Sequence, residues 1–303
     1  MQAQLFSAGP ICLDRSEMAS FDVLEPSSLD EAFSLLDFED PSVRPIGGGT
    51  ALMLMMKAQI YRPRRLVSLR RLKGMFSGVD LNADGSAFRI GAMTTFAALE
   101  HSPEIGARLP VIPRTMKTLA NVRVRNVATV GGNLAHADPH LDLPPVWMAL
   151  DARAKIVGPR GERIVPMADI FVGYYETTIA NDELIAELEV PVRAGWRSHY
   201  VKITTRAAHD WPALGLTLSL LIEGCTVKDA RLVLSAAVDC PLRLTDAEAI
   251  LKGSEIGPDL LKRASEAAAA QPNIESDSRG SEDYKRHLLK VHLGRAVEAM
   301  AAE

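Results

Sequence analysis

Two spacings of apolar residues alternate along the first part of the chain. After Ser27 and Ser28, apolar residues recur three and four positions apart, which predicts a serine-capped helix over 29–36. A second helix is expected over 51–57, directly after a run of glycines. Strands are expected over 21–26, 43–46 and 66–69. This alternation predicts a small α/β unit with parallel strands.

Short apolar runs separated by Gly and Pro fill the middle of the chain. They predict a strand over 88–92, a short helix that ends at Leu99, and a longer helix over 108–119 with two prolines inside it. The later runs predict a helix over 146–150, a hairpin of 154–157 with 163–165, and a strand over 184–190.

The composition changes at Arg193, and a sheet followed by helices is expected from there on. Strands are expected over 214–222 and 230–238, and helices over 244–252, 258–270 and 283–300. The expected division is an N-terminal extension of 1–19, two units of 20–74 and 75–192, and a C-terminal domain of 193–303.

Composition and charge exclude several classes of protein. The net charge of −4 argues against nucleic acid as the main partner. Three widely separated cysteines, Cys12, Cys225 and Cys240, cannot supply the four thiolates of an iron–sulfur cluster, and no C-x-x-C pair suggests a zinc ribbon. They fit free thiols in a reducing cytoplasm, with Cys225 and Cys240 expected inside apolar strands. No apolar run reaches 18 residues, so no transmembrane span is expected.

Two glycine-rich turns, at 47–50 and 129–133, each follow an apolar element. Neither has the spacing of a Rossmann fingerprint or a P-loop. One interpretation is that both are ordinary polar loops, because Gly marks turns in every fold. The other is that they converge on one long ligand, with each turn holding part of a diphosphate through backbone N–H groups.

Other polar clusters have similarly open interpretations. His136 and His140 beside Asp138 and Asp142 resemble a metal-ligand set, but Pro139 makes the required regular helix improbable. The stretch 202–212 is either a surface strand-to-loop transition or a place where Trp211 stacks on a flat ring. No nucleophile with an adjacent base stands out.

Longer motifs add a family resemblance. Two motifs resemble the FAD-binding medium subunit of the molybdenum hydroxylases. The first is Ile46-Gly-Gly-Gly-Thr50. The second and more specific one is the stretch 125–144, where Thr-x-Gly-Gly-Asn is followed by Ala-Asp-Pro-x-x-Asp-Leu-Pro. That family includes the flavoprotein subunits of carbon monoxide dehydrogenase and xanthine dehydrogenase. The resemblance covers about 21–300 and implies an α+β protein. A vanillyl-alcohol-oxidase-type (PCMH-type) FAD-binding domain of two subdomains would precede a smaller C-terminal α+β domain, a sheet flanked by helices.

The resemblance also implies which residues contact FAD, and it implies no catalytic or metal-ligating residue in this chain. The two turns would enclose the diphosphate through backbone N–H groups, Asp142 would bind a cofactor hydroxyl, and Trp211 would lie near the isoalloxazine. Ala51 departs from the Asp or Ser that the family commonly has. The implied FAD-binding residues are Ile46, Gly47, Gly48, Gly49, Thr50, Ala51, Leu52, Thr95, Thr129, Val130, Gly131, Gly132, Asn133, Asp142, Leu184, Lys202 and Trp211.

The implied role is electron transfer in a heterotrimeric molybdenum hydroxylase, with a dimer of heterotrimers expected. Substrate would react in a large molybdopterin-binding subunit, and a small subunit with [2Fe–2S] clusters would pass electrons to FAD here. FADH₂ would then reduce an external acceptor. The alternatives are a stand-alone flavin-dependent oxidase or reductase of the same fold, and a non-catalytic nucleotide-binding module.

Overall fold

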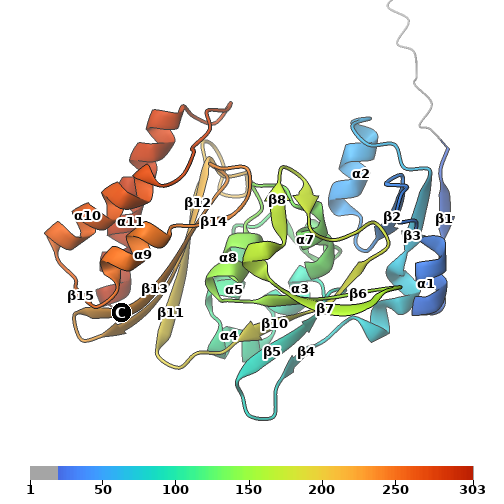
Figure 1. Ribbon diagram of the computed structural model, residues 1–303, viewed down its shortest axis with the longest axis horizontal. Helices are drawn as coiled ribbons and strands as arrows, with labels where there is room; N and C mark the ends of the chain where they lie inside the picture. Colours follow the sequence, from blue (N-terminus) through green and yellow to red (C-terminus); the bar gives the residue numbers. More distant parts are fainter. Residues whose placement is uncertain (1–19, 303) are drawn as a thin grey trace, which may run out of the picture.

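The structure, a computed structural model, describes residues 20–302, so the expected extension of 1–19 lies outside the described residues. Three sheet-containing parts follow one another across the molecule, from the N-terminal part (blue) through a central part (green) to the C-terminal part (orange and red) (Figure 1). A further two-stranded hairpin packs on the central part.

The first part is the small parallel α/β unit that the pattern predicts. Its sheet has the order β1-β3-β2, and both pairings are parallel. Ala32 and Leu36 are buried on the predicted helix face, and Ser28 caps that helix by accepting from the N–H of Glu31. The elements are β1 (Asp22–Leu24), α1 (Leu29–Leu35), β2 (Val43–Ile46), α2 (Thr50–Lys57), β3 (Arg65–Ser68) and the 3₁₀ helix η1 (Leu69–Met75).

The central part is an antiparallel five-stranded sheet, of order β4-β5-β10-β6-β7, with short helices packed on it. Trp147 is fully buried in its core. The strands are β4 (Val79–Leu81), β5 (Ala87–Gly91), β6 (Arg153–Gly158), β7 (Gly161–Pro166) and β10 (Leu184–Pro191), and the hairpin is β8 (Phe171–Gly173) with β9 (Glu176–Thr177). The helices are α3 (Phe96–Glu100), α4 (Pro103–Arg108), α5 (Val111–Met116), α6 (Val122–Arg125), α7 (Val130–His136), α8 (Leu143–Ala149) and the 3₁₀ helix η2 (Met167–Asp169).

The single helix expected over 108–119 is wrong. Helix α4 ends at Arg108 and α5 begins at Val111. Pro110 lacks an N–H and pushes the preceding Leu109 out of the helical region, to φ −132° and ψ 59°. The proline therefore separates two helices instead of kinking one.

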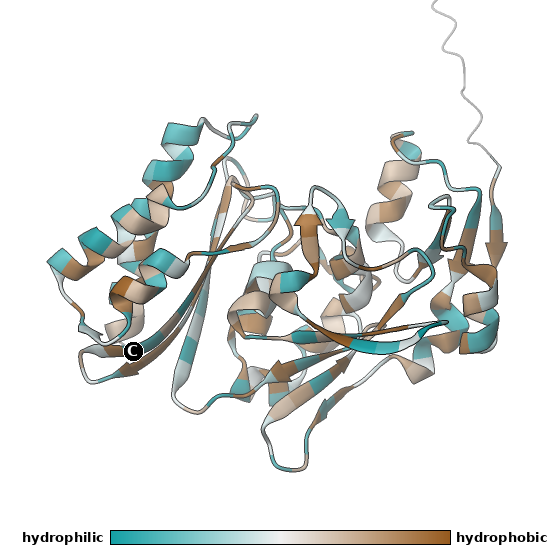
Figure 2. Ribbon diagram, viewed as in Figure 1, coloured by the Kyte–Doolittle hydropathy of each residue, from teal (hydrophilic) through white to brown (hydrophobic). Residues whose placement is uncertain are grey.

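The C-terminal part is an antiparallel sheet of order β11-β12-β13-β14, with α9, α10 and α11 on one of its faces (Figure 1). Strands β12 and β13 are largely apolar, whereas the outer sides of these helices are hydrophilic (Figure 2). The elements are β11 (Trp196–Ile203), β12 (Leu214–Glu223), β13 (Thr226–Ser235), β14 (Leu242–Arg243), α9 (Thr245–Leu251), β15 (Ser254–Glu255), which pairs with β13, α10 (Pro258–Ala270) and α11 (Glu282–Ala302).

Three expectations for this part need correction. The second strand spans Thr226–Ser235 instead of 230–238, because the turn after β12 is tight. Strand β11 was not predicted, since its apolar and polar residues do not alternate clearly. Neither cysteine lies in a strand, because Cys225 is exposed in that turn and Cys240 is half-buried in the bend after β13.

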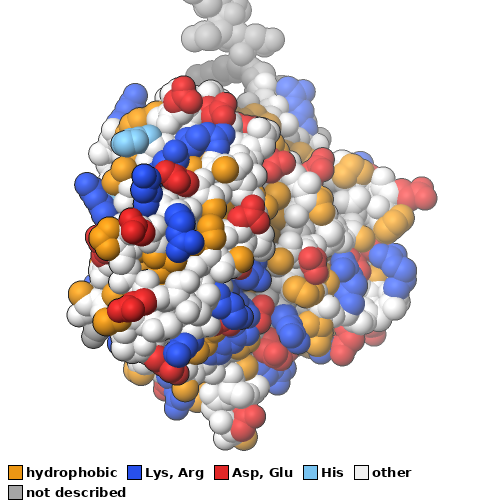
Figure 3. Space-filling view, turned by 60° about the vertical axis from the view of Figure 1, so that its left-hand side comes forward, with side chains coloured by type: hydrophobic (Ala, Val, Ile, Leu, Met, Phe, Trp, Pro, Cys, Tyr) orange, Lys and Arg blue, Asp and Glu red, His pale blue; other side chains and the backbone are white. Residues whose placement is uncertain are grey.

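The outer surface carries charges of both signs. Lys and Arg side chains are interspersed with Asp and Glu over the face that Figure 3 shows. Among residues 20–302, none of the helices combines the length and the apolar character needed to cross a bilayer.

Candidate functional site

The first glycine-rich turn connects β2 to the N-terminus of α2. Gly49 is the N-cap of α2 and has a φ of 68°, in the left-handed region that favours glycine. Because glycine has no side chain, no side-chain hydrogen bond caps the start of this helix. Within the described residues, the backbone N–H groups from Gly48 to Leu52 have no hydrogen-bond acceptor. The turn therefore presents a set of open donors at the positive end of a helix.

The second glycine-rich segment is the first turn of α7 and not a free turn. Thr129 is the N-cap, and its Oγ1 accepts from the N–H of Gly132 at 3.2 Å. The other N–H groups also have acceptors: Val130 donates to the Thr94 carbonyl at 3.0 Å and Gly131 to the Ala92 carbonyl at 2.7 Å. Asn133 donates to the Thr129 carbonyl at 2.9 Å. All four N–H groups of this segment therefore already have acceptors within the protein, unlike those of the first turn.

The two glycine-rich segments meet, although about 80 positions separate them in the sequence. A Cβ on Gly47 would lie 2.9 Å from Oγ1 of Thr129, and a Cβ on Gly48 would lie 2.1 Å from the carbonyl oxygen of Val127. Gly47 and Gly48 are thus required for the approach of one segment to the other. The two segments therefore lie side by side, as the sequence suggested, and a ligand shared between them stays a prediction.

One polar atom beside this junction has no partner. The side-chain Oδ1 of Asn133 is buried and accepts no hydrogen bond within the described chain. Leaving such an atom unpaired is costly, so it commonly marks a missing ligand or water. Gly132 is exposed, and a Cβ there would approach only Oγ1 of Thr129, at 2.9 Å. Thr95 pairs with Thr129 through an isolated bridge and caps α3.

Asp142 lies in a buried cluster beyond α7. Its Oδ2 accepts from Nζ of Lys202 at 3.0 Å, and its Oδ1 accepts from the hydroxyl of Tyr200 at 2.7 Å. Lys202 also donates to the Thr118 carbonyl at 3.0 Å. Burial raises the pKa of Asp142, and the charge of Lys202 opposes that shift. Burial also raises the pKa of Tyr200 well above its ordinary value. The cluster joins the central part to β11.

The segment between α7 and Asp142 holds a second, partly exposed network. Asp138 accepts from the backbone N–H of His140 at 2.8 Å and from the hydroxyl of Tyr175 at 2.8 Å. Burial alone would raise the pKa of Asp138. Hydrogen bonds with the His140 ring, the His140 N–H and the Tyr175 hydroxyl outweigh it, and the pKa lies below its ordinary value. The His140 ring stacks on Trp211, with centroids 5.4 Å apart and a 12° angle, and Arg279 lies over the same indole.

The structure also shows where Leu184 and the two histidines of the expected metal-ligand set lie. Leu184 is buried in the core between the first and central parts, together with Val67 and Met93. His136 and His140 do not share a helix, because α7 ends at His136. Among the described residues, no group of three or more His, Cys, Asp or Glu side chains is arranged to hold a metal ion.

Sequence reasoning missed Tyr200 and the hydrogen bond from Tyr175 to Asp138. Tyr200 and Lys202 are two positions apart on β11, so both point to the face that contacts Asp142. Recognition of β11 would have linked them. Tyr175 had no comparable signal, because it lies in the tight turn between β8 and β9 with a φ of 57°.

Comparisons with known proteins agree with this architecture. The family described as "FAD binding domain in molybdopterin dehydrogenase" matches residues 19–193, and the "CO dehydrogenase flavoprotein C-terminal domain" matches residues 199–300. The carbon monoxide dehydrogenase medium chain of Afipia carboxidovorans is 32% identical over 283 residues, covering 93% of this chain and 97% of the relative. The glyceraldehyde dehydrogenase medium chain of Sulfolobus acidocaldarius is 30% identical, covering 93% and 98%.

Solved structures show the same similarity. Carbon monoxide dehydrogenase from Hydrogenophaga pseudoflava has a chain with a TM-score of 0.87 and 34% identity, covering 92% of this chain and 96% of that one. Quinoline 2-oxidoreductase from Pseudomonas putida 86 has a TM-score of 0.86 and 27% identity, covering 94% and 98%. The fold is thus the expected FAD-binding domain followed by a smaller C-terminal domain. The chain belongs to the FAD-binding family of the molybdopterin dehydrogenases, as the medium, flavoprotein subunit of an oxidoreductase.

Proposed function

We propose that the chain is the electron-transfer subunit of a heterotrimeric molybdenum hydroxylase. In this role it receives electrons from [2Fe–2S] clusters of a small subunit and passes them to an external acceptor. The observation that carries the proposal is the junction of the two glycine-rich segments. It combines open backbone donors, the unpaired Oδ1 of Asn133 and an uncovered Gly132. Bound FAD supplies the redox chemistry, because it accepts electron pairs and releases them again.

The residues at the junction fit a diphosphate-bearing cofactor. N–H groups at a helix N-terminus bind anions, and here the set from Gly48 to Leu52 has no competing acceptor in the described chain. The side-chain oxygen of Asn133 would accept a hydrogen bond from a hydroxyl or N–H group of the cofactor. Thr129 would act as a positioning residue, because its Oγ1 is committed to the N–H of Gly132. In this proposal the first segment binds the anion and the second shapes the space beside it.

The more distant residues would form the walls of the same site. Asp142 accepts one hydrogen bond on each oxygen, and a carboxylate oxygen has a second lone pair that could accept from a cofactor hydroxyl. Lys202 would hold that carboxylate in place. Leu184 would supply an apolar surface, and Trp211 with His140 would cover the flavin end. We also propose that 20–74 and 75–192 act as two subdomains around FAD and 193–303 as the third domain.

The relatives suggest the partners. They are named medium chains or subunits of multi-subunit enzymes, so large and small partner subunits are implied. We propose that the large subunit binds molybdopterin, that the small subunit holds the [2Fe–2S] clusters, and that two heterotrimers associate. The proposed setting is the cytoplasm, in keeping with the three widely separated cysteines.

Purification of the full chain, followed by titration with FAD, tests the function. We expect close to one FAD per chain, a flavin absorption spectrum, and no turnover of an organic donor unless the partner subunits are added. A chain that binds no FAD would contradict the proposal. Turnover of an organic donor by the chain alone would favour a stand-alone flavin oxidase or reductase.

A further inference from the structure

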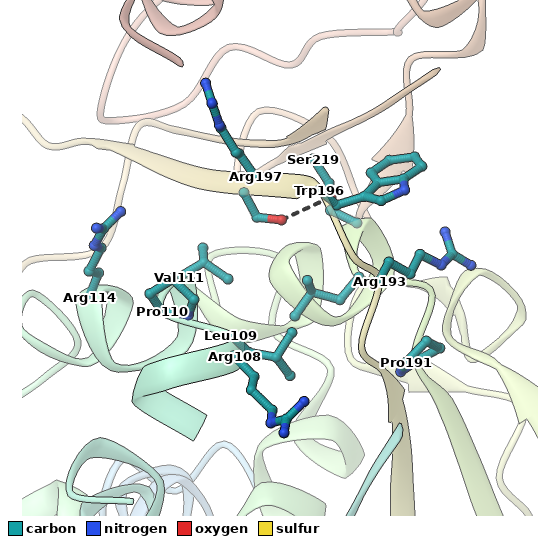
Figure 4. Close-up of a pocket in the computed structure, with 13 residues that line it drawn as sticks. Arg108, Leu109, Pro110, Val111, Arg114, Pro191, Arg193, Trp196, Arg197 and Ser219 are labelled. Carbon is teal, nitrogen blue, oxygen red and sulfur yellow. Dashed lines mark hydrogen bonds between the residues drawn. The ribbon is translucent and has the colours of Figure 1, made fainter. Parts of the chain in front are cut away.

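Helix α5 lies beside strand β11, and the two ends of the helix meet the strand differently. Near the start of α5, a cavity of about 140 Å³ lies between the helix and β11, and the guanidinium groups of Arg108 and Arg114 point in different directions (Figure 4). Beyond the end of α5 there is direct contact, because Nζ of Lys202 donates to the Thr118 carbonyl at 3.0 Å. The turn of residues 118–120 is thus a point where the central part holds β11.

A second cationic side chain holds the same turn. Nη1 of Arg125 donates to the carbonyls of Leu119 and Ala120, at 2.9 and 3.4 Å. Three successive carbonyl oxygens therefore accept hydrogen bonds from two cations. No backbone N–H group of residues 20–302 donates to these three carbonyls. Lys202 and Arg125 thus supply hydrogen bonds that the backbone does not.

The backbone of this turn needs such support. Ala120 has a φ of 46°, in the left-handed region that residues with a side chain adopt at a cost in free energy. Hydrogen bonds from charged donors are stronger than those between neutral groups. The bonds from the two cations therefore offset the strain at Ala120 and keep the turn in one conformation.

The guanidinium of Arg125 is itself fixed. Its Nε donates to Oε2 of Glu100, the last residue of α3, at 2.8 Å. The two side chains are only 12% and 17% exposed, so solvent and salt screen this pair weakly. Arg125 thus connects α3 to the turn with separate nitrogen atoms of one planar group, which the single ammonium of a lysine cannot do.

Arg125 lies between two parts of the proposed cofactor site. It is the last residue of α6, two positions before Val127, whose carbonyl lies against Gly48 at the junction of the glycine-rich segments. Through the turn, it is connected to Lys202, which donates to Oδ2 of Asp142 at 3.0 Å. One buried guanidinium therefore supports both the junction and the carboxylate.

We propose that Arg125 is a positioning residue of the cofactor site, which holds the turn 118–120 against Lys202 and thereby fixes the carboxylate of Asp142. This inference rests on the proposed function in FAD binding. The competing role for Arg125 is attraction of the anionic cofactor by its charge alone. The two roles differ at Glu100, because loss of its negative charge would favour an anion but would also release the guanidinium.

Fluorescence titration of the full chain with FAD tests the positioning role. Arg125→Met should bind FAD about tenfold more weakly, because the turn and Asp142 lose their fixed arrangement. Arg125→Lys keeps the charge but cannot span Glu100 and the turn, so it should lose nearly as much affinity. Glu100→Gln is a milder change that should also weaken FAD binding, and it serves as the test if Arg125→Met does not fold. Full affinity in Arg125→Lys, or tighter binding by Glu100→Gln, would overturn the proposal.

Arg243→Met is the matched control. Arg243 is half-buried and pairs with Glu248 within the C-terminal part, outside the proposed cofactor site. Both methionine variants should lower the free energy of unfolding measured in urea, but only Arg125→Met should weaken FAD binding by the folded chain. Equal losses of FAD affinity would show that Arg125 only stabilises the fold. An original chain that binds no FAD would instead overturn the proposed function.

The pH dependence of FAD binding gives a readout that a loss of stability would not change. Burial raises the pKa of Asp142, and the charge of Lys202 opposes that rise, as does the hydrogen bond from Tyr200. In Arg125→Met the looser turn should weaken the hold of Lys202, so the pKa of Asp142 should rise further and its carboxylate should become protonated as the pH falls. The loss of FAD affinity should therefore be larger at pH 6 than at pH 8. An equal loss at both pH values would show that Arg125 does not act through Lys202 and Asp142.

Discussion

The two glycine-rich segments look alike in sequence but are used differently in the structure. The N–H groups from Gly48 to Leu52 have no acceptor among the described residues. In contrast, each N–H group from Val130 to Asn133 already donates within the protein. N–H groups without an acceptor at the start of a helix can bind an anion, whereas N–H groups that already donate within the protein hold the segment in position. A glycine-rich motif thus indicates that another group lies close to the backbone. The hydrogen bonds of its N–H groups then show whether that group is a ligand or another part of the protein.

The glycines themselves differ in the same way. Gly48 is packed against a backbone carbonyl, so its lack of a side chain serves the junction between the segments. Gly132 is exposed, and its lack of a side chain leaves space next to Asn133. Substitutions at these two positions should therefore affect folding and ligand binding separately.

The largest effect is expected where the segment between α7 and α8 is anchored to the C-terminal sheet. Asp142→Leu leaves the Lys202 ammonium buried without its carboxylate, at an expected cost of about 3–5 kcal/mol in the free energy of unfolding. Urea denaturation measures the change. The control Glu223→Gln breaks an exposed ion pair of 3.7 Å and should change stability by less than about 0.5 kcal/mol. Similar small losses in both variants would show that the cluster does not anchor this segment.

Gly48→Ala should be the next most damaging change. The added Cβ would overlap the Val127 carbonyl, and forcing the two segments apart should cost about 1–3 kcal/mol. Gly106→Ala is the matched control, because its Cβ meets nothing within 4 Å and lies in helix α4. That control should be neutral or slightly stabilising in the same urea experiment. A neutral Gly48→Ala would mean that the segments do not touch as described.

Sequence reasoning found the fold more readily than it found the details of the site. The α/β unit and helix α11 follow from the local spacing of apolar residues, which a single segment contains. The convergence of Gly47 with Thr129 was suggested by two similar motifs. The use of each N–H group depends on Ala92 and Thr94, which are distant in sequence, so no local pattern reveals it. Likewise, Tyr200 became visible only once β11 paired with β12.

Asn133→Leu separates ligand binding from stability. The Oδ1 of Asn133 is buried without a partner, so its replacement by an apolar group should leave the free energy of unfolding of the FAD-free chain unchanged or slightly higher. FAD affinity should fall by about tenfold, because a hydrogen bond to the cofactor is lost. Fluorescence titration with FAD measures the affinity. Unchanged FAD affinity would place the cofactor away from Asn133.

The smallest effect concerns pH. The pKa of Asp138 is held below its ordinary value in the folded chain, so its carboxylate contributes stability above its unfolded pKa of 3.8. That contribution is lost as the pH falls through the folded pKa. Asp138→Asn should therefore lose about 1 kcal/mol at pH 7, and the gap to the original chain should narrow below about pH 4.

Urea denaturation at pH 7 and at pH 3.5 measures this difference. Asp80→Asn, at an exposed position on β4, should differ little from the original chain at either pH. A gap for Asp138→Asn that is constant across pH would show that the carboxylate charge does not contribute.

The FAD content of Gly132→Val tests the central claim most directly. The valine side chain would fill the exposed space at Gly132 that we assign to the cofactor. Its Cβ would also lie 2.9 Å from Oγ1 of the Thr129 cap, so we expect some loss of stability but a preserved fold. We expect FAD binding at least about a hundredfold weaker than in the original chain, with the circular dichroism spectrum preserved. Gly106→Val, in α4, should keep one FAD per chain. Stoichiometric FAD in Gly132→Val would contradict the assignment of this junction as the cofactor site.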